Sequence, residues 1–181
     1  MTRIIAGAYG GRRIQTPKGD GTRPTSDRVR EALFSSLESE LGGFDGVRVL
    51  DLFAGSGALG LEALSRGADH ATFVESDARA AAVVKGNVRD LGASATVQRT
   101  TAERFVETGE PGPFDLVFVD PPYAMATEKV AGLVAALAGV AGEHDILFVV
   151  ERSSRDPFEW PDGVEGIRSK KYGETTLLYG R

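Results

Sequence analysis

From residue 47 onward, short apolar runs alternate with stretches whose apolar residues recur every three or four positions. The runs predict buried strands at Val47–Phe53, Ala71–Glu75, Ala95–Arg99, Phe114–Asp120 and Ile146–Glu151. The stretches between them predict helices at Ala58–Arg66, Ala78–Leu91, Ala102–Thr108 and Thr127–Ala141. Strands that alternate with helices build βαβ units, so we expect an α/β fold with a doubly wound parallel sheet covered on both faces.

The two ends of the chain follow a different pattern. Arg3–Gly7 and Arg12–Thr16 read as short strands on either side of a glycine turn, and a loop follows at Pro17–Pro24. Asp27–Leu37 has helical periodicity, with Ser26 or Asp27 as a cap and Gly42-Gly43 as a stop. Near the other end, Gly166–Tyr172 and Thr175–Tyr179 predict an antiparallel hairpin at the sheet edge. We therefore expect an N-terminal hairpin and loop at 1–24, appended to a main domain at 25–181.

Composition narrows the chemistry. The 181 residues, 41% hydrophobic and 26% charged, fit one globular domain. The chain has no cysteine, which excludes a disulfide framework, a thiolate zinc site and a cysteine nucleophile. The two histidines, His70 and His144, lack the spacing of metal ligands, so no metal is expected. No apolar run approaches 18 residues, and we expect a cytoplasmic monomer without membrane contact.

Charge is distributed unevenly. Residues 1–30 carry seven basic and two acidic side chains, although the whole chain has a formal net charge of −5. A basic arm on an acidic body predicts a local phosphate-binding patch. A set of solvated arginines on a short hairpin is the alternative. The candidate RNA-binding residues of this segment are Arg3, Arg12, Arg13, Arg23, Thr25 and Arg28.

A glycine-rich turn follows the first strand of the main domain. Gly55, Gly57 and Gly60 fit GxGxxG between a strand and a helix, where glycine lets a ligand approach the backbone. Glu75 ends the next strand, 18 positions beyond Gly57, where it can accept the ribose hydroxyls of an adenosine-containing cofactor. Asp51 precedes the glycines. Its charge would repel a dinucleotide pyrophosphate but favours the ammonium and sulfonium of S-adenosylmethionine.

A second motif, Asp120-Pro121-Pro122-Tyr123, ends the strand Phe114–Asp120. Ligands of open α/β sheets bind at the carboxyl ends of strands, so the motif is expected beside the glycine turn. Asp120 and the carbonyl of Pro121 can accept hydrogen bonds from an exocyclic amino group, and Tyr123 offers a flat face to an unstacked base. Two such acceptors can orient the delocalised lone pair of the amine and stabilise the developing positive charge. The predicted catalytic residues are therefore Asp120, Pro121 and Tyr123.

These motifs resemble those of class I methyltransferases, and Asp-Pro-Pro-Tyr is their amino-methyltransferase signature. Arg23-Pro24-Thr25, Asp27–Glu31, Leu52–Ala63 and Lys171–Thr175 are more specifically similar to the bacterial 16S ribosomal RNA guanine-N2 methyltransferase D family. The resemblance covers nearly the whole chain. It implies a Rossmann-like sheet of seven mostly parallel strands with a terminal antiparallel hairpin.

The resemblance also implies N2 methylation of one guanine in 16S ribosomal RNA, within an assembling or assembled small subunit. The implied cofactor is S-adenosylmethionine. Its expected contacts are Asp51, Phe53, Gly55, Gly57, Glu75, Ser76, Ala102, Glu103 and Asp120. The segment Thr101-Ala102-Glu103 departs from the Asn or Asp before Ala that many relatives carry, so adenine contacts there would fall to the backbone.

Three other functions share parts of this pattern. DNA amino-methyltransferases for adenine N6 or cytosine N4 also carry the motif at Asp120, but sequence-selective ones usually need an additional recognition domain. In glutamine-N5 protein methyltransferases, the corresponding motif resembles Asn-Pro-Pro-Tyr rather than Asp-Pro-Pro-Tyr. A nicotinamide oxidoreductase or a non-catalytic nucleotide-binding module would use the glycine turn but not Asp51 or Asp120. S-adenosylhomocysteine and NAD titrations would separate these last two from a methyltransferase.

Overall fold

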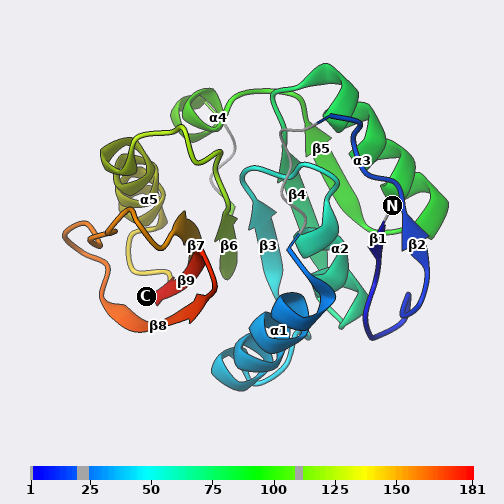
Figure 1. Cartoon of the computed structure of the whole chain (residues 1–181), viewed down its shortest axis with the longest axis horizontal. Helices are drawn as coiled ribbons and strands as arrows, with labels where there is room; N and C mark the ends of the chain where they lie inside the picture. Colours follow the sequence, from blue (N-terminus) through cyan, green and yellow to red (C-terminus); the bar gives the residue numbers. More distant parts are fainter. Residues whose placement is uncertain (1, 20–24, 109–111) are drawn as a thin grey trace.

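The computed structural model describes residues 2–19, 25–108 and 112–181 and contains a seven-stranded sheet (Figure 1). The sheet order is β5-β4-β3-β6-β7-β9-β8. Its strands are β3 (Arg48–Asp51), β4 (His70–Val74), β5 (Ala95–Gln98), β6 (Leu116–Val119), β7 (Leu147–Ser153), β8 (Gly166–Tyr172) and β9 (Thr175–Gly180). The first five in this order are parallel, and β9 pairs antiparallel with both β7 and β8. The predicted α/β class, with a parallel sheet that ends in an antiparallel hairpin, is confirmed.

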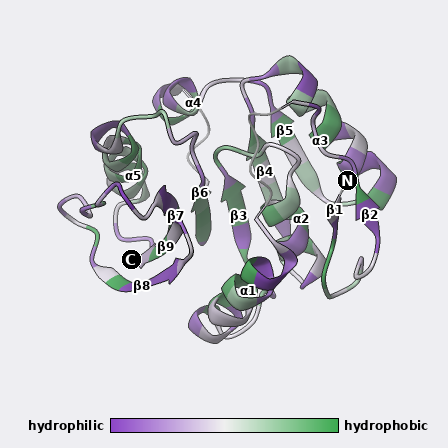
Figure 2. Cartoon of the chain, in the orientation of Figure 1, coloured by the Kyte–Doolittle hydropathy of each residue, from purple (hydrophilic) through white to green (hydrophobic). Residues whose placement is uncertain are grey.

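Helices cover both faces of the sheet, as the alternating pattern predicted. The first core cluster packs α1 (Asp27–Leu41), α2 (Ala58–Ser65) and α3 (Ala78–Leu91) on one face. The second core cluster packs α4 (Ala102–Thr108) and α5 (Thr127–Ala141) on the other. Figure 2 shows hydrophobic positions concentrated in the central strands, between these two layers. Parallel strands buried on both faces need such continuous apolar runs.

Helix α1 has the N-terminal cap and the glycine stop that the sequence predicted. The Ser26 side chain accepts a hydrogen bond from the Val29 amide, which satisfies one of the free donors at the helix start. Gly42 ends the helix in the left-handed conformation, at φ 71°. The helix runs four residues past Leu37, to Leu41, which packs against the first core cluster.

The N-terminal hairpin is present but short. β1 (Thr2–Arg3) pairs antiparallel with β2 (Arg13–Ile14) in a sheet of its own. Ile4 and Ile14 are 0% and 2% exposed and belong to the first core cluster. The segment thus packs on the body through apolar contacts. Residues 20–24 of the expected loop lie outside the described residues, and the boundary at residue 24 stays a prediction.

Candidate active site

Four acidic residues stand at the carboxyl ends of four neighbouring strands. Glu75 follows β4, Asp51 ends β3, Asp120 follows β6, and Glu151 lies in β7. Strand side chains alternate between the two faces, and the residue two positions before each acid belongs to the first core cluster. The four acids therefore face the side of the sheet that α1, α2 and α3 cover. Together the four acids form a row along the sheet, and this row brings the glycine turn and the motif at Asp120 close to each other.

Asp51 is a buried carboxylate beside the start of α2. The residue is 1% exposed, and its Oδ2 accepts a hydrogen bond from the Gly60 amide at 3.1 Å. The pKa of Asp51 is raised to about 7, chiefly by burial and also by the charge of Glu75, while the hydrogen bond from the Gly60 amide acts in the opposite direction. A cation placed against this carboxylate would stabilise its ionised form.

Each glycine of the turn is required for a different structural reason. Gly55 and Gly57 adopt positive φ of 58° and 84°, which L side chains rarely adopt. A Cβ at Gly55 would meet nothing within 4 Å, so a ligand has room to approach the backbone there. A Cβ at Gly60 would instead overlap the Phe73 ring of β4. Gly60 therefore allows close packing of α2 on the sheet.

Glu75 links the tip of β4 to the glycine turn. Its Oε1 accepts from the Gly55 amide at 3.0 Å and its Oε2 from the Asp77 amide at 2.9 Å. The carboxylate is held at the mouth of the turn and keeps lone pairs for further donors. Ser76 next to it is exposed, and Phe53 is half-buried against the second core cluster.

The predicted adenine contacts lie at the start of α4. Ala102 is 4% exposed, and the Thr101 hydroxyl accepts from the Arg104 amide as a helix cap. The Glu103 carboxylate pairs with Lys129 of α5 at 2.8 Å, and this hydrogen bond holds the pKa of Glu103 below its usual range. Its side chain thus joins two helices, and a cofactor contact by Glu103 stays a prediction.

The motif Asp120–Tyr123 follows β6 and leads into a turn at 122–125. Asp120 is half-buried and Pro121 is buried, and the Pro122 carbonyl accepts from the Met125 amide at 2.9 Å. Desolvation raises the pKa of Asp120 well above its usual range, and the nearby carboxyls of Glu151 and Asp51 raise it further. Asp51 is in register with Phe118, two residues before Asp120, so the two predicted sites lie on adjacent parallel strands.

Two neighbours of the motif were not predicted. Glu151 is 8% exposed and shares a side-chain hydrogen bond with Asp120. The Tyr123 hydroxyl lies 2.9 Å from the Thr175 hydroxyl, at the turn between β8 and β9. An acidic residue at the end of an apolar strand was the signal for Glu151, but only the pairing of β6 with β7 places it beside Asp120.

The basic arm is the hairpin of β1 and β2 with the residues that flank it. Arg3, Arg12 and Arg13 are exposed, as is Arg28 on α1, and Thr25 is half-buried. Arg3 pairs with Asp27 at 3.1 Å, and Arg12 donates to the Asp90 carbonyl at the end of α3 at 2.8 Å. Arg23 lies outside the described residues.

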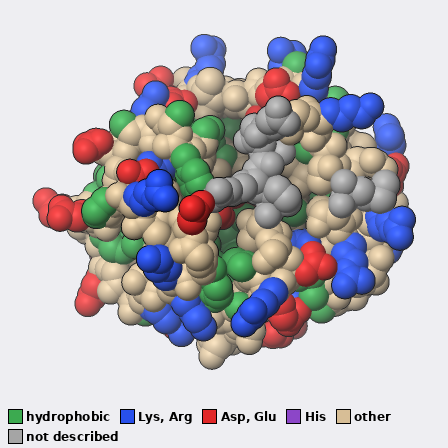
Figure 3. Space-filling model, viewed as in Figure 1, with side chains coloured by type: hydrophobic (Ala, Val, Ile, Leu, Met, Phe, Trp, Pro, Cys, Tyr) green, Lys and Arg blue, Asp and Glu red, His purple; other side chains and the backbone are tan. Residues whose placement is uncertain are grey.

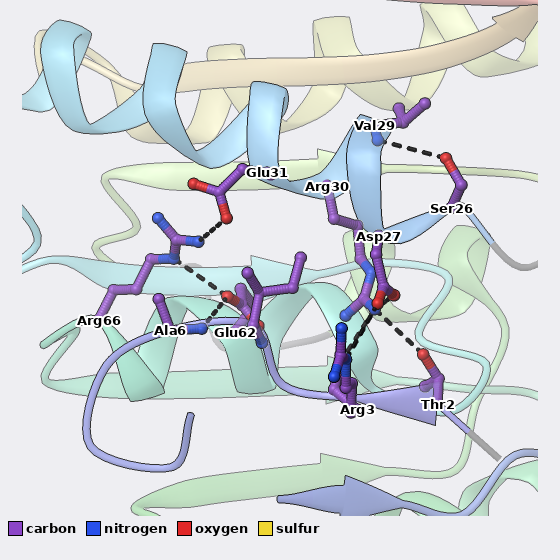
Figure 4. Close-up of polar contacts among 11 residues, drawn as sticks. Thr2, Arg3, Ala6, Ser26, Asp27, Val29, Arg30, Glu31, Glu62 and Arg66 are labelled. Carbon is purple, nitrogen blue, oxygen red and sulfur yellow. Dashed lines mark hydrogen bonds and ion pairs between the residues drawn. The ribbon is translucent and has the colours of Figure 1, made fainter. Parts of the chain in front are cut away.

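Buried polar groups hold the arm on the body (Figure 4). Glu62 of α2 is 0% exposed and accepts hydrogen bonds from the amides of Ile5 and Ala6 and from Arg66 Nε. Arg30, 1% exposed, donates to Thr2, to the Arg3 carbonyl and to Asp27. Removing such a partner from a buried charge is costly, so these contacts fix the arm's position.

The arm continues into a wider basic surface. Asn87 of α3 is 2% exposed and bonds the Gln15 amide and carbonyl, and also the Ser56 carbonyl in the glycine turn. Lys85 and Arg89 on the same helix are exposed and were not predicted. Figure 3 shows Lys and Arg side chains gathered on the side of the molecule where β1, β2 and α3 lie.

Three further observations concern the described residues alone. They contain no group of three or more His, Cys, Asp or Glu side chains placed to hold a metal ion. No helix among them is long and apolar enough to cross a membrane. A cavity of about 360 Å³ is lined by Thr2, Arg3, Arg13 and Asp27. The described residues that line it belong to the arm and to the first turn of α1.

The fold and the site together define a class I methyltransferase architecture. A solved protein of Thermus thermophilus superposes with a TM-score of 0.81, with 32% identity over 99% of this chain and 98% of that one. The magnesium protoporphyrin IX methyltransferase of Synechocystis, solved with bound S-adenosylmethionine, has a TM-score of 0.65 over 84% of this chain and 77% of its own. Its identity is 14%, so it supports the fold alone.

Sequence comparison then identifies the family. The model of the family described as conserved hypothetical protein 95 matches residues 2–181. A Haemophilus influenzae protein named ribosomal RNA small subunit methyltransferase D is 42% identical over 94% of this chain and 89% of its own length. The chain therefore belongs to this family, whose named members include rRNA methyltransferases, and the predicted resemblance is confirmed.

Proposed function

We propose that this chain transfers a methyl group from S-adenosylmethionine to the exocyclic N2 of a guanine in 16S ribosomal RNA. One observation carries the proposal: Asp51 at the end of β3 and Asp120 after β6 lie on adjacent parallel strands and face the same side of the sheet. A methyl donor held at the turn would thus adjoin an amine held by Asp120. The names of the family's members support ribosomal RNA as the substrate.

The residues around the glycine turn fit this cofactor. The Asp51 carboxylate, buried and with its pKa raised to about 7, would be stabilised by the methionine ammonium. Glu75 reaches the mouth of the turn and keeps lone pairs for ribose hydroxyls. Open space at Gly55 allows the backbone approach. Bound there, S-adenosylmethionine supplies an electrophilic methyl group on a sulfonium.

The motif residues would act on the amine. Ionised Asp120 and the Pro121 carbonyl accept hydrogen bonds from the two N–H groups of the amine. These bonds turn the nitrogen lone pair toward the methyl donor. Tyr123, whose hydroxyl is held by Thr175, presents its ring to the flipped base. As the nitrogen becomes positively charged, Asp120 stabilises it, and the amine proton leaves through this carboxylate or through water.

Nucleoside mass spectrometry of ribosomal RNA tests the proposal directly. Small-subunit RNA from a strain without this gene should lack one N2-methylguanosine, and the wild-type gene should restore it. The Asp120→Ala gene should not restore it. The purified protein should methylate the mutant strain's RNA or its small subunits, and comparing the two identifies the substrate particle. Appearance of N6-methyladenine or N4-methylcytosine instead would contradict the guanine assignment.

A further inference from the structure

Asp120 and Glu151 form a carboxyl pair at the carboxyl ends of two adjacent parallel strands. Val119 of β6 is in register with Val150 of β7, so the next residues, Asp120 and Glu151, stand side by side. Both face the side of the first core cluster, and their side chains share a hydrogen bond. Glu151 is 8% exposed, and the charge of Asp51 acts on the same pair.

The basic residue that follows Glu151 does not serve this pair. Arg152 faces the opposite side of the sheet, where it is 1% exposed. Its guanidinium donates to the Met125 carbonyl at 2.8 Å and to the Thr127 hydroxyl at 3.1 Å. On the other side of the sheet, Asp51 acts on Asp120 of the pair, so three carboxyl groups lie at the carboxyl ends of β3, β6 and β7.

Such a pair holds a proton until a ligand replaces it. Two adjoining carboxylates repel each other when both are ionised, so one proton is shared between them. A ligand that presents two neighbouring N–H donors can bond both carboxylates and release that proton to solvent. Guanine has these donors at N1 and N2 of its Watson–Crick edge. When both carboxyls are ionised, the ring nitrogen lone pair that adenine and cytosine carry beside the amine would face a carboxylate, which is unfavourable.

We propose that Glu151 selects guanine by accepting a hydrogen bond from its N1–H while Asp120 accepts from the N2 amine. This inference rests on the proposed function, because it assumes that the motif at Asp120 holds the reacting amine. It assigns Glu151 a role in choosing the base, a role that the motif alone does not carry.

A base analogue tests the N1 contact. Once the target guanine is mapped, a substrate RNA is ligated with either guanine or 2-aminopurine at that position. The analogue keeps the 2-amino group but has an acceptor at N1. We expect the wild-type protein to prefer guanine in kcat/KM by about 10- to 100-fold, since a mismatched buried polar pair costs this much. Equal kcat/KM for both bases in the wild type would overturn the proposal without any variant.

The Glu151→Gln variant tests whether the preference for guanine over 2-aminopurine comes from this side chain. A glutamine amide can accept from N1–H or donate to N1, so the preference should fall to within about threefold. The matched control is Glu159→Gln, an exposed acid further along the chain, which should keep the wild-type ratio. Affinity for S-adenosylhomocysteine should be unchanged in both variants and serves as the folding check.

The outcomes separate this inference from the proposed function. A wild-type ratio retained in folded Glu151→Gln would remove Glu151 from base selection while leaving guanine methylation intact. A product methylated on adenine or cytosine would overturn both the guanine assignment and the role of Glu151. Absence of methyl transfer to any RNA would instead contradict the proposed function itself.

Discussion

At the scale of single residues, the site depends on carboxyl groups that are kept from water. Asp51 ends β3 and is 1% exposed, Asp120 follows β6 and is half-buried, and desolvation raises the pKa of both. A carboxyl held in this way is ready to ionise when a cation or an N–H donor arrives. Ligand binding should therefore be linked to proton release.

Asp51 should make cofactor binding depend on pH. Its pKa is about 7 in the folded protein, above the ordinary 3.8, so its contribution to folding stability is full below about 4 and is lost as pH rises through 7. The ammonium of the cofactor favours the ionised form. Affinity for S-adenosylmethionine should thus increase as pH rises from about 5 to about 8, with protons released. Calorimetry in buffers of different ionisation enthalpy measures both quantities. Asp51→Asn should bind more weakly, without this pH dependence.

Substitutions at Asp120 should affect turnover, and substitutions at Tyr123 should affect RNA binding, more than either affects cofactor binding. Asp120→Asn removes the charge that stabilises the amine in the transition state, and we expect a loss on the order of 100-fold or more in kcat. Tyr123→Ala should weaken RNA binding by about 1–3 kcal/mol through lost stacking, whereas Tyr123→Phe keeps the ring. Single-turnover kinetics with calorimetry for the cofactor separate the two effects. A normal rate in folded Asp120→Asn would contradict the mechanism.

At the scale of elements, the strands and helices were predictable because the central parallel strands are apolar runs, although the edge strand β5, Ala-Thr-Val-Gln, is not. The caps of α1 and the glycine turn follow from local chemistry in the same way. Strand order and the partners of buried polar residues were not predictable. Glu62 is part of an ordinary helical stretch in sequence, yet it is fully buried and holds the arm. Glu151 and Asp120 are likewise neighbours only because β6 pairs with β7.

Gly60 tests how closely α2 packs on the sheet. A Cβ there would overlap the Phe73 ring, so Gly60→Ala should destabilise the protein by about 1–3 kcal/mol. Gly139→Ala in α5 is the matched control, because a Cβ at that position meets nothing within 4 Å. It should be neutral or stabilise by up to about 1 kcal/mol through helix propensity. Denaturant unfolding measures both, and equal effects would mean that Gly60 is not required for packing.

At the scale of the whole molecule, charge is arranged in two regions. The acidic row and the basic arm lie on a chain with net charge −5, and α3 adds Lys85 and Arg89 beside the arm. Asn87 forms hydrogen bonds with both the arm and the glycine turn, so the two segments share a support. We expect the arm to position RNA phosphates and the acidic row to select and hold the base.

The salt dependence of RNA binding tests the arm. Phosphate contacts release counterions, so their number sets how steeply affinity falls with salt. Replacing both Arg12 and Arg13 by Ala should weaken RNA binding and flatten the log–log slope by about one to two units, with cofactor affinity unchanged. The control removes the same charge elsewhere, as Arg48→Ala with Arg104→Ala, two exposed positions outside the arm. Both affinity and slope should then stay close to wild type. If the arm variant has the same RNA affinity and the same salt slope as the wild type, the arm has a structural role and does not contact phosphates. The next candidates for phosphate contacts are then Arg168, Lys170 and Lys171 on β8.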